Sequence, residues 1–423
     1  MNHQPWQDYF SFPRQLTGWI GETLTDITPY WEKIDHTVLI NQHRVLQAMQ
    51  QERIGEEDFQ DSTGYGDNDR GREKLEAIYA ELFKAEAALV RSQIVSGTHA
   101  LALALFGLLR PGEELLFVTG APYDTLQVVV GSKGGEEGTL KEWGIRYRYL
   151  PLAENGEPDL SRLEPGSRPR VAYIQRSIGY EVGQRALSIA KLKELIAAIR
   201  SLFPKAWILV DNCYGEFVET DEPTAAGADL AVGSLIKNPG GGLAASGGYV
   251  AGKKELVHKI ASRFSAPGLY GNLGAMASKR NLFQGLFLAP GLVGNALKNA
   301  IFAARLFEKM GYKVKPGFDQ PRGDIVQAIV LGDQARLELF CQAIQGASPI
   351  EHYVTPVPAA PPGYDDPIIM AAGTFIQGAS GELTADGPLR PPYAVFLQGA
   401  LSLAHALWAT CRAAEALLTV GHP

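Results

Sequence analysis

Short apolar runs with the character of strands alternate with helical segments through the middle of this 423-residue chain. Parallel strands need long crossover connections, usually helices, so the alternation predicts a largely parallel sheet covered on both faces. A segment at 247–251 is expected to return the chain along this sheet. The other expected strands are 88–94, 114–118, 145–150, 171–175, 207–210 and 230–232, and the helices among them are 99–110 and 188–203.

Helical periodicity marks the two flanks of this region. On the N-terminal side it runs over 16–55 and, after a polar Gly-rich turn at 64–71, over 72–84. On the C-terminal side we expect a helix at 293–310, a strand at 324–331, a helix at 334–344, a Pro-rich loop at 356–367 and one long packed helix at 393–420.

These segments predict three parts of the chain. Residues 1–63 form an N-terminal arm, 64–292 a large α/β domain, and 293–423 a smaller C-terminal α+β domain. A chain of this length can bury a large core and is expected to fold as more than one domain.

Composition narrows the classes of partner. The net charge of −7 gives no general attraction to nucleic acid or to anionic membranes, and we expect neither as a partner. The three cysteines, Cys213, Cys341 and Cys411, are too few and too scattered for a disulfide framework or a zinc site, and we expect no metal. The first residues contain no basic segment followed by an apolar one, so no secretory signal is expected. A cytoplasmic protein fits these features best.

Asp211 and Lys237 each follow an apolar run and precede polar or Gly-rich residues. In open α/β sheets, ligands bind outside the carboxyl ends of the strands. A lysine and an aspartate delivered there suit pyridoxal phosphate, because the lysine forms the Schiff base and the aspartate pairs with the pyridinium nitrogen. Alternatively, Lys237 is a solvated surface lysine and Asp211 caps a turn.

Ser96, Gly97 and Thr98 stand where a strand passes into a helix. Free N–H groups at a helix N-terminus favour anions, so this tripeptide is a candidate cradle for the cofactor phosphate, although it is also an ordinary N-cap. Ser234 could add a hydroxyl to the same phosphate, or it could be a buried serine bonded to the backbone.

Two further residues are candidates for contacts with the cofactor and the substrate. Tyr123 follows the next strand and could stack on the pyridine ring, or it could simply begin a helix. Arg390, in a Pro-rich segment, is the best candidate to bind a substrate carboxylate, because guanidinium binds carboxylate with two parallel hydrogen bonds. A surface arginine is the competing interpretation.

Taken together, these motifs resemble the fold-type I pyridoxal phosphate enzymes of the cystathionine and methionine lyase group, and in particular its aluminium resistance, or methionine gamma-lyase-like, branch. The resemblance covers nearly the whole chain and implies a mostly parallel seven-stranded sheet. The matching segments are 64–67 (GYGD), 95–100 (VSGTHA), 121–125 (APYDT), 211–217 (DNCYGEF), 234–242 (SLIKNPGGG), 373–377 (GTFIQ) and 390–393 (RPPY).

The resemblance also implies a homodimer or homotetramer in which two subunits form each active site. Tyr65 matches the tyrosine that reaches the neighbouring subunit's cofactor phosphate. The arginine expected two positions later is Asp67 here, so Arg70 or Arg72 would have to replace it. The asparagine expected beside the cofactor's phenolic oxygen is not obvious, because Gln175 stands about where it should be.

The expected reaction is β- or γ-elimination from a sulfur-containing amino acid. Lys237 would take the Cα proton, Asp211 would stabilise the electron-poor ring, and Tyr123 or Tyr65 would protonate the leaving group. Two alternatives remain. One is a pyridoxal phosphate enzyme of another reaction type, such as an aminotransferase, a decarboxylase or an aldolase, and the other is a non-catalytic stress-response protein that kept the fold.

Overall fold

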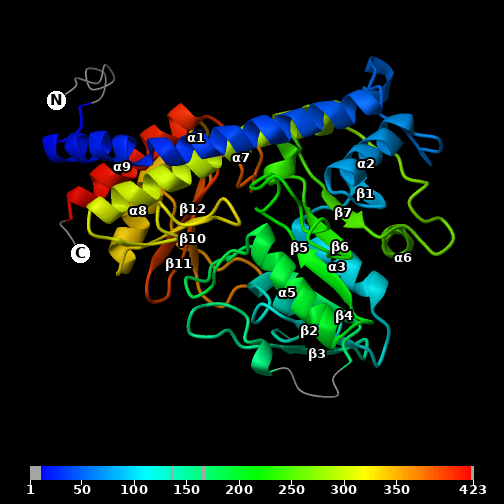
Figure 1. Ribbon diagram of the computed structural model, residues 1–423. Coiled ribbons are helices and arrows are strands. Elements are labelled where there is room, and N and C mark those ends of the chain that lie inside the picture. The colour runs from blue at the N-terminus through cyan, green and yellow to red at the C-terminus, as the bar shows by residue number, and fades with distance from the viewer. Residues whose placement is uncertain (1–10, 135–136, 163–167, 421–423) are drawn as a thin grey trace.

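The computed structural model describes residues 11–134, 137–162 and 168–420, so the first ten residues of the predicted arm lie outside it. A seven-stranded sheet forms the larger part of the protein (Figure 1). Strand β7 runs antiparallel to both of its neighbours, β1 and β6, as expected of the returning segment. Across the sheet the order is β1 (Ala87–Arg91), β7 (Gly248–Gly252), β6 (Leu230–Ser234), β5 (Trp207–Asp211), β4 (Val171–Gln175), β2 (Glu114–Phe117) and β3 (Arg146–Tyr149).

Alternate residues of these strands enter different buried clusters, because successive side chains of a strand point to opposite faces. Leu209 lies in a cluster with α3 (Gly97–Leu108) and α6 (Lys254–Phe264), whereas Ile208 and Val210 lie in one with α5 (Ile189–Leu202). Burial on both faces explains why the strands are almost continuously apolar. This part also contains helices α2 (Arg70–Leu82) and α4 (Asp124–Val130) and short 3₁₀ turns that include η2 (Glu56–Phe59) and η3 (Leu160–Arg162).

A second sheet of five antiparallel strands forms the smaller, C-terminal part. Helix α8 (Gln334–Gly346) packs against this sheet, and α9 (Leu403–Leu418) packs against α8. The predicted fold class, a large α/β part with a smaller α+β part, is therefore confirmed, while the domain boundaries stay a prediction. The strand order is β10 (Ile368–Ala371), β11 (Thr384–Pro388), β12 (Ala394–Gln398), β9 (Gln327–Val330) and β8 (Lys313–Lys315).

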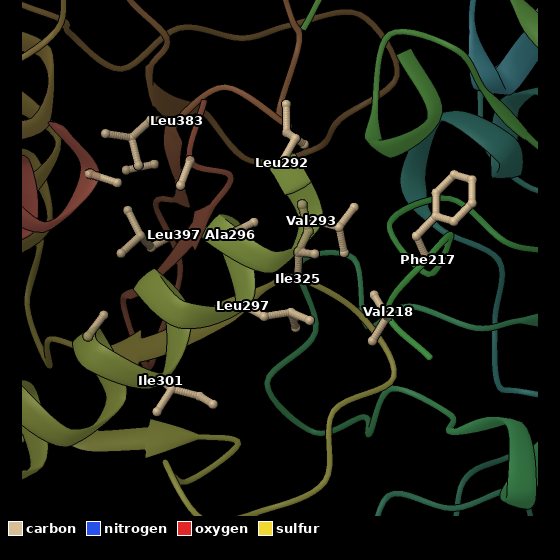
Figure 2. Close-up of a cluster of buried hydrophobic side chains, with 14 of the residues drawn as sticks. Phe217, Val218, Leu292, Val293, Ala296, Leu297, Ile301, Ile325, Leu383 and Leu397 are labelled. Atoms are coloured by element: carbon tan, nitrogen blue, oxygen red, sulfur yellow. The ribbon is translucent and has the colours of Figure 1, made fainter. Parts of the chain in front are cut away.

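Two long helices, α1 (Arg14–Gln51) and α7 (Lys279–Lys309), lie side by side across both parts (Figure 1). In Figure 2, α7 separates Phe217 and Val218 of the larger part from Leu383 and Leu397 of the smaller one. By length and composition α7 could cross a membrane, but 72% of its most apolar window is buried, as in the core helix of a folded protein.

The start predicted for α7 was wrong. The helix begins at Lys279, not at residue 293, and passes through Pro290. Proline usually ends or kinks a helix, but Pro290 and its neighbours Ala289 and Leu292 are buried in the core. Tertiary packing of this kind contributes more to helix stability than intrinsic propensity does.

The single helix predicted over 393–420 was also wrong. Ala394–Gln398 forms strand β12, and α9 begins only at Leu403. Gly399 separates them with φ +82, and a Cβ there would lie 2.2 Å from the carbonyl oxygen of Ser380. A short strand that is buried on both faces has the same apolar pattern in the sequence as part of a buried helix. Periodicity therefore could not distinguish β12 from the helix that follows it.

Candidate active site

A cavity of about 260 Å³ lies at the carboxyl ends of the central parallel strands. Gln175 and Asp211 are the last residues of β4 and β5 and pair with each other across the sheet. Ser234 ends β6, and Lys237 follows three residues later. The structure thus brings seven of the predicted site residues to one cavity, namely Ser96, Gly97, Thr98, Tyr123, Asp211, Ser234 and Lys237.

Lys237 is held by the loop that follows it. The 3₁₀ turn η4 (Asn238–Gly240) begins at the next residue, and Asn238 donates to the carbonyl of Glu216 at 3.0 Å. Gly241 has φ +55, and a Cβ there would lie 2.1 Å from the carbonyl oxygen of Gly285 in α7. This backbone-to-backbone contact requires glycine and fixes the loop.

The Lys237 ammonium lies over the ring of Tyr214, with Nζ 3.8 Å from the ring centroid. Burial alone would lower the pKa of Lys237, but the acidic groups of Cys213, Tyr214 and Asp211 outweigh burial and raise it. The Lys237 amine is therefore protonated unless another cation lies beside these three groups.

Asp211 is 5% exposed and accepts hydrogen bonds from the backbone N–H of Cys213 at 3.1 Å and from the Tyr173 hydroxyl at 3.0 Å. Burial raises the pKa of Asp211, although Lys237 and these donors oppose that rise. A cation beside its carboxylate would favour the ionised form. Tyr173 was not predicted as a site residue.

The N-terminus of α3 forms the opposite wall. The Ser96 hydroxyl accepts from the backbone N–H of His99 at 3.0 Å, so Ser96 is the N-cap of the helix. A Cβ on Gly97 would lie 3.2 Å from Sγ of Cys213 and 3.3 Å from Cβ of Ser234. Glycine therefore allows the helix end to approach the strand ends closely.

Hydroxyl groups lie around this helix end. The Thr98 hydroxyl is 3.0 Å from that of Tyr123 and 3.1 Å from that of Thr125. Burial raises the pKa of Tyr123, and the nearby Asp211 adds to the rise. Ser234 Oγ is buried and, among the described residues, has no hydrogen-bond partner. Of the two predicted roles of Ser234, the serine bonded to the backbone is therefore wrong.

Gln175 stands about where the resemblance implies an asparagine. Its Nε2 donates to the carbonyl of Ser177 at 2.9 Å, whereas its Oε1 is buried and has no hydrogen-bond partner among the described residues. Gln175 thus offers an amide to this cavity from the end of β4.

Several lining residues come from segments that the sequence did not connect with the site. Tyr180 and Gln398 both donate to Asp386, at 2.9 and 3.0 Å. Tyr214 and Tyr364 complete this side of the cavity. A signal existed only for Tyr214, which lies in the motif after Asp211; the others depend on packing between the two parts of the chain.

Three predicted site residues are not in this cavity. Tyr65 is 78% exposed, and Arg70, also exposed, lies 3.8 Å from Glu57. Arg390 contacts two carboxylates instead, Glu181 at 2.8 Å and Asp366 at 3.1 Å. Its guanidinium is thus already neutralised, and a direct contact with a substrate carboxylate finds no support in this arrangement.

Arg72, the other candidate to replace the missing arginine, is fully buried. It donates to the carbonyls of Gly66, Asn272 and Gly274 at 2.6–3.0 Å. Those bonds hold the turn that carries Tyr65, so Arg72 is structural, and only Arg70 of the two faces solvent.

The cavity suits a flat, anionic cofactor that carries an aldehyde. A helix N-terminus and the unpartnered Ser234 hydroxyl can bind a phosphate. The Tyr123 ring forms a wall, Lys237 supplies an amine, and Asp211 supplies a buried carboxylate. The residues therefore fit pyridoxal phosphate.

Comparisons with known proteins identify relatives of this chain. The model of the methionine gamma-lyase family matches residues 17–418. A solved carbon-sulfur lyase involved in aluminium resistance, from Clostridium novyi NT, is 42% identical with a TM-score of 0.92, and the match covers 97% of this chain and 98% of that one. The uncharacterized protein YnbB of Bacillus subtilis (strain 168) is 47% identical over 401 residues, 94% of this chain and 95% of the relative.

A more distant structure is the pyridoxal-5'-phosphate dependent protein YhfS of Escherichia coli. It is 18% identical with a TM-score of 0.59, and the match covers 89% of this chain and 96% of that one. At this identity the similarity concerns the fold alone. The predicted fold-type I architecture is confirmed.

Proposed function

The chain belongs to the methionine gamma-lyase family, and from this membership and the cavity we propose that it is a pyridoxal phosphate dependent lyase that cleaves a carbon–sulfur bond of an amino acid. The observation that carries the proposal is the convergence of Lys237, Asp211 and the N-terminus of α3 on one cavity. An amine, a buried carboxylate and an anion site together serve this cofactor, whereas a simple binding module needs no such set.

When bound, pyridoxal phosphate supplies an electron sink for the charge that develops at the substrate Cα. Asp211 would pair with the ring nitrogen and keep it protonated. Asp211 is one of the groups that raise the pKa of Lys237, so this pairing would lower that pKa again. Nζ of Lys237 can then be neutral and take the Cα proton, and positioned proton transfer contributes about 10²–10⁴-fold to a rate.

The leaving sulfur needs a proton donor. Tyr123 is the better placed of the two proposed tyrosines, because it lines the cavity with Lys237 and Asp211. The raised pKa of its hydroxyl keeps the proton in place at neutral pH. Tyr65 can serve this cavity only from another subunit.

The proposal includes a homodimer or homotetramer with shared active sites. The exposure of Tyr65 and Arg70 supports it, since neither side chain lines this chain's own cavity. A cytoplasmic location is also part of the proposal, and the three buried cysteines, all free thiols, are consistent with a reducing compartment.

A visible spectrum tests the cofactor directly. Purified protein supplied with pyridoxal phosphate should show an absorption band at the edge of the visible range. Reduction with borohydride should leave the cofactor covalently attached to the peptide that contains Lys237. Pyruvate or 2-oxobutyrate, with ammonia and a thiol, should form from thioether amino acids. A colourless protein contradicts the cofactor, and amino-group exchange alone contradicts the lyase.

A further inference from the structure

Tyr364 enters the cavity from the C-terminal part of the chain, at the centre of the segment Pro361–Pro367, which we name the strap. Its ring lies 5.9 Å from that of Tyr180. Among the described residues its hydroxyl has no hydrogen-bond partner, whereas the hydroxyls of Tyr123 and Tyr180 bond to Thr98 and Asp386. Burial raises the pKa of Tyr364 to about 12, so the hydroxyl keeps its proton at neutral pH.

Ion pairs hold the strap on both sides of Tyr364. Asp365 lies 2.6 Å from Lys133, which also contacts Asp124 at the start of α4 at 2.9 Å. Asp366 lies 3.1 Å from Arg390, the residue predicted to bind the substrate. Two consecutive aspartates thus tie the strap to two different segments of the chain, those that carry Lys133 and Arg390.

Arg390 also contacts residues 180 and 181. It lies 2.8 Å from Glu181 and donates to the carbonyl of Tyr180 at 3.3 Å. Arg390 therefore joins the strap to the segment that carries Tyr180, the ring against which Tyr364 packs.

Glycine at position 363 lets the strap approach α4. Its φ is +86, and a Cβ there would lie 3.2 Å from Cγ2 of Thr125. The Thr125 hydroxyl lies 3.1 Å from that of Thr98 in the first turn of α3. The strap thus contacts Thr125 beside the proposed phosphate site, and its Tyr364 lines the same cavity as Lys237.

We propose that Tyr364 is a substrate-contacting residue, which donates a hydrogen bond to the substrate, and that Arg390 is a positioning residue that acts through Asp366 to hold Tyr364 in place. This inference rests on the proposed function. In the positioning role, the guanidinium of Arg390 keeps the ion pairs described above. The ion pairs of the strap are partly exposed, and such pairs are individually weak, so the strap can open when substrate enters and product leaves.

A double-mutant cycle on the loaded enzyme tests the coupling. Tyr364→Ala and Arg390→Met should each raise KM about 10-fold with a smaller change in kcat, and the double variant should be no worse than the poorer single variant. Multiplied effects, about 100-fold, would mean that Arg390 binds substrate on its own and would overturn the positioning role. Tyr364→Phe keeps the ring and should raise KM about 3–10-fold, and an unchanged KM would exclude the hydrogen bond.

Hydrogen exchange supplies a readout that does not depend on turnover. Amides of the strap should exchange about 10-fold faster in Arg390→Met and in Asp366→Asn than in the wild type. Arg412→Met, which breaks an ion pair with Glu415 in α9, is the matched control and should change neither exchange in the strap nor KM. Unchanged hydrogen exchange of the strap in Arg390→Met would contradict the positioning role of Arg390. A protein that takes up no pyridoxal phosphate would instead contradict the proposed function.

Discussion

The Tyr173 hydroxyl donates a 3.0 Å hydrogen bond to Oδ2 of Asp211 from the neighbouring strand β4. A hydrogen bond to a charged group contributes about 1.5–3 kcal/mol, so its loss in Tyr173→Phe should raise the pKa of Asp211 further, by about 1–2 units. We expect pyridoxal phosphate to bind about 10-fold more weakly and kcat to fall by a similar factor. Titration of the cofactor absorbance and steady-state rates measure both.

Tyr149→Phe is the matched control for that variant. Tyr149 is 54% exposed on the edge strand β3, so removal of its hydroxyl should change neither cofactor affinity nor kcat. Equal affinities in Tyr173→Phe and the wild type would show that Asp211 does not depend on this donor.

Ser234 tests the phosphate site. Its Oγ is buried without a partner among the described residues, so Ser234→Ala removes no hydrogen bond within the cofactor-free protein and should leave its thermal midpoint unchanged or slightly higher. If the hydroxyl binds the cofactor phosphate, the dissociation constant should rise roughly 3–10-fold. A variant that loses thermal stability but keeps its affinity would assign Ser234 to the core.

The central sheet could be predicted from the sequence because its signals are local. The strands from β4 to β6 are buried on both faces, and Asp211 ends such a strand, so composition alone indicated the edge where ligands bind. Tyr173 was within reach of the same reasoning. It stands two residues before Gln175 in β4, and residues two apart share a face of a strand.

Other parts depend on contacts between distant segments. β12 could not be separated from α9, because packing against β9 and β11, rather than periodicity, makes it a strand. Arg390 looked like a carboxylate ligand because its chemistry suits one, and only the fold reveals that Glu181 and Asp366 already face it. Tyr364 lies more than a hundred residues from Lys237 in the sequence, and no local pattern connects them.

The two arginines near the N-terminal turn should behave differently. Arg72→Met removes the donor from three carbonyls and should lower the free energy of unfolding by about 3 kcal/mol. Arg70→Met removes an exposed side chain, so we expect a change within about 0.5 kcal/mol. If subunits share the site as proposed, Arg70→Met should nevertheless weaken cofactor binding. Urea denaturation measures the stability of both variants, and cofactor titration measures their affinity for the cofactor. Equal cofactor affinity in Arg70→Met and the wild type would show that Arg70 is not part of the shared site.

Two buried carboxyl groups behind the site, those of Glu216 and Glu222, make stability depend on pH. Glu216 accepts from the Tyr249 hydroxyl at 2.8 Å, and its Oε2 has no hydrogen-bond partner among the described residues. Burial, with the charge of Glu222 adding to it, raises the pKa of Glu216 to about 8. Glu216 is therefore protonated in the folded protein at pH values where the unfolded chain has already released that proton.

From this difference we expect the cofactor-free protein to lose stability between about pH 4.5 and 8. Over that range the folded state holds a proton that the unfolded state does not, so the free energy of unfolding falls as pH rises, by at most about 1.4 kcal/mol per unit from this group. Burial raises the pKa of Asp386 to about 6, which adds a fall of the same sign below that pH. Glu216→Gln keeps the acceptor for Tyr249 without the titration, so its stability should change less between pH 6 and 8 than that of the wild type. Urea midpoints at both pH values measure the change in stability, and Glu142→Gln, on an exposed turn, is the control. Parallel pH profiles of stability for the wild type and Glu216→Gln would show that Glu216 is ionised in the folded protein.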